Sequence, residues 1–143
     1  MIDARTAPYA ALLLRVALGI MFVAHGLLKV FVFTLPGTAQ FFASQGFPGW
    51  SAYPVVAAEL VGGLLLIAGY HTRIVAAALI PVLIGAASVH IGNGWLFSGA
   101  NGGWEYPVFL VVIAAVVALL GDGAYALKPS ASADRVLGAP RHA

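Results

Sequence analysis

The segment that decides the fold runs from Tyr53 to Tyr70 and reads YPVVAAELVGGLLLIAGY. Its length is close to the ~20 apolar residues that an α-helix needs to cross a bilayer. The apolar residues form a continuous run rather than an alternating pattern, which is typical of a membrane helix and not of a strand in a membrane barrel. Its one charged residue is Glu59. We therefore predict a transmembrane helix that holds a carboxylate within the membrane.

Three further apolar stretches of similar length flank this segment, at about 9–33, 73–91 and 106–127. Together the four stretches predict an all-α membrane protein, a four-transmembrane-helix bundle that occupies residues 1–128. The polar, small-residue-rich end at 129–143 is predicted to be a flexible cytoplasmic tail.

Composition supports lipid as the main solvent of this protein. Of its 143 residues, 62% are hydrophobic and only 8% are charged, whereas a soluble domain carries about 25% charged residues. The net charge of +2 comes from scattered residues and indicates no nucleic-acid partner. The chain has no cysteine, so disulfides and cysteine-ligated iron–sulfur clusters are excluded within it. Any redox role therefore needs a bound cofactor, a quinone or a partner protein.

The connections between the spans differ in character. The first, from Thr34 to Ala52, is uncharged and contains the amphipathic piece TAQFFASQ at 38–45, which predicts a short helix at the membrane interface that ends near Gly46 and Pro48. The second connection, Tyr70 to Arg73, is so short that the helices on either side must be antiparallel neighbours.

The distribution of Lys and Arg predicts that both ends of the chain lie in the cytoplasm (N-in/C-in). Apart from Arg15 and Lys29 within the first span, these residues lie before the first span, in the second connection and after the last span: Arg5, Arg73, Lys128, Arg135 and Arg141. The tryptophans lie in the other two connections, where an aromatic belt at the outer interface is expected: Trp50, Trp95 and Trp104.

On this topology the polar side chains form two layers. The outer layer contains His25, Lys29, Glu59, His90, Asn93 and Glu105, and the inner layer contains Arg15, His71, Arg73 and Asp122. His25 and Lys29 are four residues apart and share one helix face. Glu59 shares a face with two glycines, Gly62 and Gly63, and small residues let a neighbouring helix approach closely. We therefore expect Glu59 to point at a helix interface.

The outer layer has the chemistry of a quinone-headgroup site. The two carbonyl oxygens of a quinone need hydrogen-bond donors, and a nearby carboxylate can pass protons to the outer face. We predict that His25 and Lys29 bind the headgroup oxygens and that Glu59 and Glu105 transfer protons. His90 and Asn93 would complete the pocket.

Other interpretations of the same residues stay open. Glu59 paired with Lys29 or His25 can be a purely structural ion pair that fixes helix packing. A bis-histidine haem between His25 and His90 is disfavoured, because histidines on separate helices more often only form hydrogen bonds. The set His25, Glu59, His90 and Glu105 has no recognised metal-binding spacing, so no metal is predicted.

The remaining polar and aromatic residues have structural interpretations. Arg15 with Asp122 or Arg73 is expected to be structural. His71 is expected to be a solvated turn residue, and Trp95 and Trp104 are expected to be interface anchors.

The sequence resembles the DoxX family of four-helix bacterial membrane proteins. The matching pieces are LRVALG at 14–19, HGLLK at 25–29, ELVGG at 59–63, GYHTR at 69–73, HIGNG at 90–94, EY at 105–106 and GDG at 121–123. The resemblance implies a multi-pass protein of the bacterial plasma (inner) membrane. Some members look like small subunits of quinone-linked oxidoreductases, including thiosulfate:quinone oxidoreductase, and others are associated with soluble redox enzymes.

We therefore predict a membrane subunit that binds quinone or quinol and serves a partner oxidoreductase, without catalysis by this chain alone. One alternative is a non-enzymatic assembly or anchoring protein. Another is a small-solute or proton transporter, for which the sequence shows no inverted repeat, although Pro81 can kink its helix and a homo-oligomer can supply a pathway.

Overall fold

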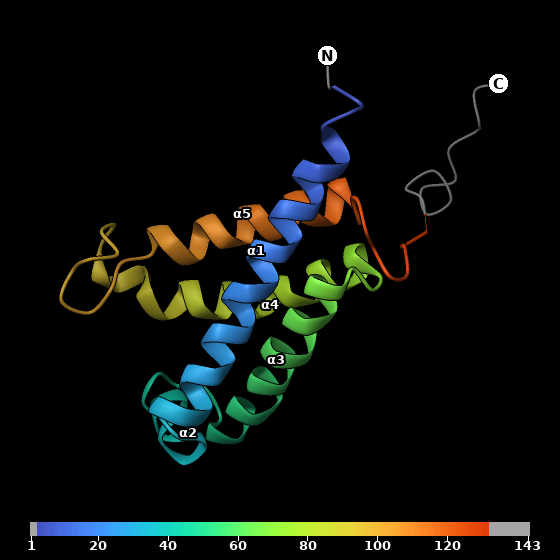
Figure 1. Cartoon of the computed structure of the whole chain (residues 1–143). Coiled ribbons are helices and arrows are strands. Elements are labelled where there is room, and N and C mark those ends of the chain that lie inside the picture. Colours follow the sequence, from blue (N-terminus) through green and yellow to red (C-terminus); the bar gives the residue numbers. More distant parts are fainter. Residues whose placement is uncertain (1–2, 132–143) are drawn as a thin grey trace.

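The computed structural model describes residues 3–131, and within them the fold is all-α (Figure 1). The helices are α1 (Ala7–Leu27), α2 (Leu35–Ser44), α3 (Ala52–Ala68), α4 (Thr72–His90) and α5 (Glu105–Leu120). A π-helix, Leu28–Val32, continues α1, and short 3₁₀ turns at Gly49–Ser51 and Ile91–Asn93 lead into α3 and follow α4.

The protein is an integral membrane protein with several apolar helices. Within residues 3–131, three helices are long and apolar enough to cross a membrane: Ala7–Val32, Gly49–Ala68 and Thr72–Asn93. The fourth predicted span contains a shorter apolar helix, α5. The short helix predicted near 38–45 is confirmed as α2. The orientation with both ends in the cytoplasm stays a prediction.

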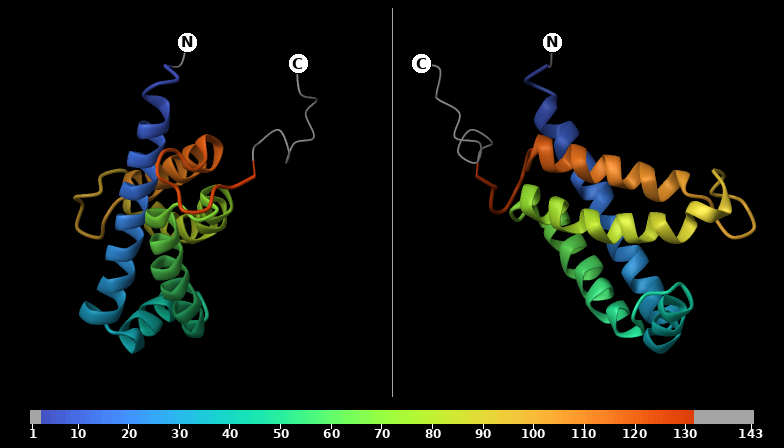
Figure 2. Two further views of the ribbon diagram at one scale, coloured as in Figure 1. Left: turned by 45° about the vertical axis from the view of Figure 1, so that its right-hand side comes forward. Right: turned by 180° about the vertical axis from the view of Figure 1, so that it is seen from behind.

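The helices form two hairpin-like pairs that cross at a steep angle. α1 packs mainly on α3, and α4 packs mainly on α5. Figure 2 shows the pairs converging near the α3–α4 turn and the end of α5, and separating toward α2 and the α4–α5 loop. The buried core lies where the pairs cross and includes Leu18, Phe22, Leu66, Leu79, Leu83, Leu110, Ala114 and Val117.

Glycines set the contact between α1 and α3. A Cβ on Gly19 would lie 2.7 Å from the Gly63 carbonyl oxygen, and a Cβ on Gly63 would lie 2.8 Å from the Gly19 carbonyl oxygen. Gly62 faces Leu79 of α4 in the same close way. The expectation that this face of α3 lies at a helix interface is therefore confirmed, and Glu59 on the same helix is only 5% exposed.

α5 ends at Leu120, whereas the sequence predicted a span that continues to about 127. Gly121 and Gly123 both adopt positive φ, at 88° and 68°. The chain then runs back along the α3–α4 turn, where the Leu127 amide donates to the Ala68 carbonyl and the His71 amide donates to the Lys128 carbonyl. Backbone pairing with that turn replaces a further helical turn. Most of the predicted tail, 132–143, lies outside the described residues.

Arg15 ties the converging end of the molecule together. Its side chain is fully buried and donates four hydrogen bonds to backbone carbonyls. Two of these belong to Leu66 and Ile67 in the last turn of α3, and the others belong to Asp122 and Ala124. The cation therefore lies where the negative end of the α3 dipole favours it.

Two other charged residues of this end, Arg73 and Asp122, cap helices. Arg73 donates to the carbonyls of Ala118, Leu119 and Leu120 at the end of α5. The Asp122 carboxylate accepts from the Thr72 amide at the start of α4 and from the amide and hydroxyl of Ser130. The structural role expected for Arg15 is supported, but its partner is the backbone carbonyl of Asp122 and not the carboxylate.

The residues at the α3–α4 turn lie close to this network. His71 is half-buried, adopts a positive φ of 48° and packs edge-on against Tyr70, with ring centroids 4.8 Å apart.

Candidate ligand pocket

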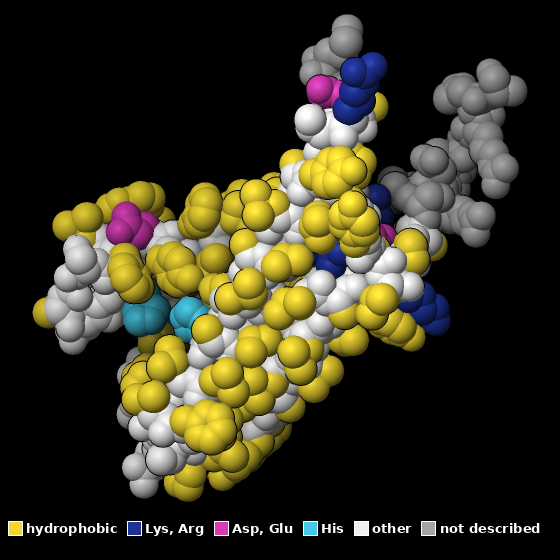
Figure 3. All heavy atoms as spheres, in the orientation of Figure 1, with side chains coloured by type: hydrophobic (Ala, Val, Ile, Leu, Met, Phe, Trp, Pro, Cys, Tyr) yellow, Lys and Arg dark blue, Asp and Glu magenta, His cyan; other side chains and the backbone are white. Residues whose placement is uncertain are grey.

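A cavity of about 430 Å³ lies at the separated end of the molecule, between the α1–α3 pair and the α4–α5 pair. In Figure 3, histidine side chains are visible in the hollow between the two arms, surrounded by hydrophobic side chains. All five α-helices contribute to the wall, most of which is apolar. The volume lies within the range of small-molecule sites, about 300–1,000 Å³.

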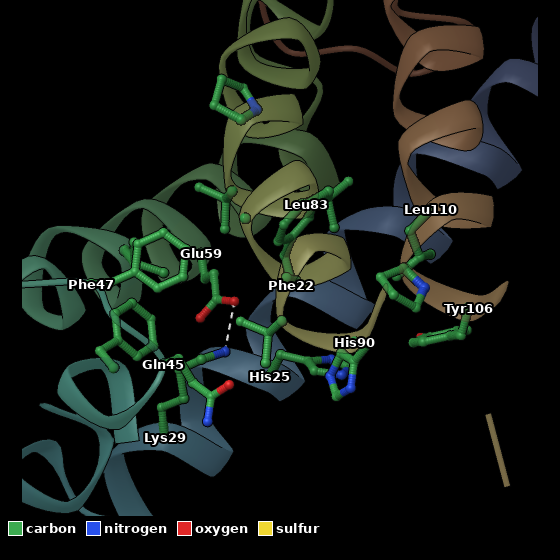
Figure 4. A pocket seen from close by; sticks show the side chains of 18 of the residues that line it. Phe22, His25, Lys29, Gln45, Phe47, Glu59, Leu83, His90, Tyr106 and Leu110 are labelled. Carbon is green, nitrogen blue, oxygen red and sulfur yellow. Dashed lines mark hydrogen bonds and ion pairs between the residues drawn. The ribbon is translucent and has the colours of Figure 1, made fainter. Parts of the chain in front are cut away.

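An ion pair between α1's π-helical continuation and α3 lies in this wall. Lys29 Nζ is 2.7 Å from Glu59 Oε1, and the two side chains are 20% and 7% exposed (Figure 4). The second oxygen, Oε2, is buried and has no hydrogen-bond partner among the described residues. The pair therefore offers one acceptor that the fold itself does not use.

The backbone around Lys29 is unusual and is fixed by α2. Lys29 lies in the π-helix, a form that occurs frequently at functional sites. Thr38 of α2 is only 3% exposed, and its hydroxyl lies 3.1 Å from the Lys29 carbonyl oxygen and 2.9 Å from the Thr34 carbonyl oxygen. This contact ties the position of α2 to the residue that carries the ammonium group.

Two histidines from different helices lie in the pocket, as Figure 4 shows. His25 Nδ1 is 2.9 Å from the Met21 carbonyl oxygen, one turn earlier in α1. Its ring stacks with that of Tyr106 of α5, with centroids 6.3 Å apart and planes at 27°. His90 Nδ1 is 3.3 Å from the Asn101 carbonyl oxygen. These contacts orient both imidazoles.

The structure brings together four of the six predicted outer-layer residues: His25, Lys29, Glu59 and His90. Asn93 and Glu105 do not line this cavity. Asn93 Nδ2 donates to the Asn101 carbonyl, and Glu105 Oε1 accepts from the Phe97 amide at 2.7 Å. Both side chains hold the loop between α4 and α5.

Three polar residues of the pocket were not predicted: Gln45, Ser51 and Tyr106. The aromatic side chains of Phe41 and Phe42 were expected only at the membrane interface, but they also line the cavity together with Phe47. The amphipathic pattern at 38–45 could have suggested that α2 covers a site. Tyr106 directly follows Glu105, so the two side chains project about 100° apart around α5.

Metal binding finds no further support in the geometry. Among residues 3–131, no group of three or more His, Asp or Glu side chains lies close enough together to hold a metal ion.

The fold and pocket define a class: a small helical membrane protein with a mostly apolar, ligand-sized cavity that contains one ion pair. The DoxX family model matches residues 10–92, and the chain therefore belongs to the DoxX family, as its sequence motifs predicted. The α5 side of the pocket, including Tyr106, lies beyond the matched range.

A relative in Bacillus subtilis (strain 168) carries the name "Putative oxidoreductase CatD". It is 41% identical over 118 residues, which cover 82% of this chain and 84% of the relative. No solved structure matches the chain.

Proposed function

We propose that the pocket binds the headgroup of a quinone or quinol and that the protein serves a partner oxidoreductase in the bacterial plasma membrane. The observation that carries the proposal is the Lys29–Glu59 ion pair in the wall of an otherwise mostly apolar cavity that two histidines share. Buried charges within a membrane protein are costly and are usually paired or functional. Within residues 3–131, Glu59 Oε2 has no hydrogen-bond partner and the Lys29 ammonium uses one of its donors.

The chemistry of the wall suits a flat ring with polar oxygens. An ammonium has three N–H donors, and within residues 3–131 that of Lys29 spends one, on Glu59. The remaining donors can reach a ligand oxygen. The rings of Phe41, Phe42 and Phe47 offer apolar surface for the headgroup and for the start of an apolar tail.

The relative from Bacillus subtilis supports a redox-associated role through its name, "Putative oxidoreductase CatD". The chain itself has no cysteine that could exchange electrons with a thiol substrate. We therefore assign binding and proton transfer to this chain and electron transfer to its partner. His25 and Glu59 are the groups that would exchange protons with the bound headgroup.

The test is to purify the protein in mild detergent and identify co-purifying quinones by mass spectrometry, followed by titration with a short-chain quinone. We expect about one quinone per protein, and a strong loss of binding in Lys29→Met and Glu59→Gln. The matched control is Glu105→Gln, which changes the same group outside the cavity and should bind normally. Wild-type protein that neither retains nor binds quinone, alone or with a partner enzyme, would refute the proposal.

A second candidate function is a non-enzymatic assembly or anchoring role. The observation that favours it is that the Lys29–Glu59 pair joins α1's continuation to α3 and so can fix helix packing. On this hypothesis, Glu59→Gln lowers thermal stability while any partner activity survives in proportion to the folded protein. Loss of partner activity from fully folded Glu59→Gln protein would exclude a purely structural role.

A further inference from the structure

We propose that the pocket selects the reduced ligand, a quinol, over the oxidised quinone. This inference rests on the proposed function and adds the redox form that the site prefers. It follows from which hydrogen-bonding groups the fold leaves unused in the pocket. A quinone presents two carbonyl oxygens, which only accept hydrogen bonds, whereas a quinol presents two hydroxyls, which also donate.

The tautomer of His25 follows from its backbone contact. A carbonyl oxygen can only accept, so Nδ1 of His25, which lies 2.9 Å from the Met21 carbonyl oxygen, must carry the hydrogen. In a neutral imidazole the other nitrogen, Nε2, then has the lone pair and is an acceptor. Within the described part of the chain, Nε2 makes no hydrogen bond. His25 therefore presents an acceptor to a ligand.

The same reasoning applies to His90, whose Nδ1 lies 3.3 Å from the Asn101 carbonyl oxygen. This contact is longer, so it fixes the tautomer less strongly than the contact of His25 does. Glu59 Oε2 adds a further acceptor that is buried and unpartnered in residues 3–131. Three acceptors from three different helices thus belong to one pocket.

The donors of the pocket do not change this preference. The Lys29 ammonium can donate to a quinone carbonyl or to a quinol hydroxyl oxygen, so it attracts both forms. The hydroxyl of Tyr106 and the amide of Gln45 can each donate or accept. A bound quinone would cover the free Nε2 of His25 without giving it a hydrogen, which is costly, and it would leave Glu59 Oε2 without a partner among residues 3–131, as it already is. A bound quinol can donate to them.

The experiment compares the binding of a short-chain benzoquinone with that of its chemically reduced quinol, without oxygen and at pH 8, where imidazole in water is neutral. For wild-type protein we expect a Kd at least about tenfold lower for the quinol. Tighter binding of the reduced form raises the midpoint potential of the bound couple, by about 30 mV for that ratio.

The decisive variant is His25→Phe, which keeps an aromatic ring and removes the acceptor. We expect the ratio of the two Kd values to fall toward 1, mainly through weaker quinol binding. The control is His71→Asn, which changes a histidine at the opposite end of the molecule, where asparagine tolerates the positive φ. It should keep the wild-type ratio.

Equal or tighter binding of the quinone by wild-type protein would overturn this inference while leaving the proposed function intact. An unchanged ratio in folded His25→Phe would also overturn it. If neither form binds to wild-type protein, the proposed function itself fails. If His25→Phe does not fold, the wild-type ratio still decides, because the acceptor-rich pocket predicts a quinol preference without any variant.

Discussion

The two ends of this molecule both bury charge in an apolar protein, but they differ in how completely that charge is satisfied. At the converging end, Arg15 donates to four carbonyls and both oxygens of Asp122 accept hydrogen bonds. At the pocket end, Glu59 Oε2 has no partner within residues 3–131, and His25 bonds through one nitrogen only. At the converging end the charged groups are saturated, and the buried atom without a partner among residues 3–131 is the uncharged Thr72 hydroxyl. Saturated charges stabilise a fold, whereas an unsaturated carboxylate has a hydrogen bond left for a ligand.

Residue type and position both contribute to this difference, because α1 and its continuation supply an arginine to one end and a lysine to the other. Arg15 has five donors and reaches carbonyls in the last turn of α3, while Lys29 has three and lies beside the middle of the same helix, where the backbone is already paired. The arginine therefore finds several backbone acceptors, and the lysine finds one carboxylate.

The largest expected effect is the loss of Arg15. Arg15→Met removes a fully buried side chain and its four hydrogen bonds, and each buried carbonyl left unpaired costs about 1–3 kcal/mol. We expect a loss of at least about 4 kcal/mol in the free energy of unfolding, seen as little or no monodisperse protein. Arg5→Met is the control, because Arg5 is exposed near the N-terminus. A wild-type Tm for Arg15→Met would contradict the saturated-network interpretation.

The Lys29–Glu59 pair should be worth less to the fold. Glu59→Gln leaves the ammonium without a counter-charge, and breaking a buried pair costs about 3–5 kcal/mol. Because Lys29 keeps 20% exposure, we expect a smaller loss, about 1–3 kcal/mol by thermal unfolding. The double variant Lys29→Met, Glu59→Leu should recover most of that loss while ligand binding stays absent. Equal destabilisation by the single and double variants would point to a structural pair.

The next effect concerns pH. Burial alone would raise the pKa of Asp122, but hydrogen bonds from Ser130 and Thr72 hold that pKa below its usual value. A lowered folded-state pKa means that the carboxylate stabilises the fold fully above the unfolded-state pKa of about 4. This contribution is lost as the pH falls through the folded-state pKa.

Measured Tm values should test this directly. Asp122→Asn should lower stability by about 1–2 kcal/mol at pH 7, the size of a helix-cap loss, and should flatten the acid limb of the Tm–pH curve. Parallel acid limbs for variant and wild type would show that another carboxylate controls this transition.

The smallest effect on stability is expected for substitutions of Gly85 in the wall of the pocket. Gly85 lies in α4 and lines the cavity, and a Cβ there would meet no atom within 4 Å. Gly85→Ala should stabilise the helix by up to about 1 kcal/mol. Gly85→Phe should fold about as well as wild type but bind quinone or quinol at least about tenfold more weakly. Unchanged affinity in Gly85→Phe would place the ligand elsewhere.

The helices could be predicted from sequence because long apolar runs with few charges have one stable solution in lipid. The end of α5 could not be predicted in this way. Residues 121–127 include apolar side chains, so hydropathy alone extends the helix through them. Instead, Gly121 and Gly123 turn the chain toward the α3–α4 turn, and Arg15 donates hydrogen bonds to carbonyls of this segment. That turn supplies backbone partners that no local sequence signal reveals.

The site could be predicted in part, because matching depths on different helices brought His25, Lys29, Glu59 and His90 into one layer. Depth says nothing about direction around a helix or within a loop. Glu105 was therefore predicted to belong to the site, although its neighbour Tyr106 is the residue that lines the pocket. The two ends also differ in how many hydrogen bonds each polar group makes. These partners come from distant parts of the chain, so the sequence alone does not reveal them.

The unequal lengths of the helices couple this protein to bilayer thickness. The continuous span Ala7–Val32 has 26 residues, or about 39 Å at 1.5 Å per residue, whereas α5 has 16 residues, or about 24 Å. In a hydrocarbon core of about 30 Å, a span of the first length is accommodated by tilting or by local thickening of the bilayer, and a helix of the second length by local thinning. The two pairs therefore place opposite demands on the same membrane, and we expect reconstitution into thinner or thicker bilayers to change the tilt of α1 and of α5 in different ways.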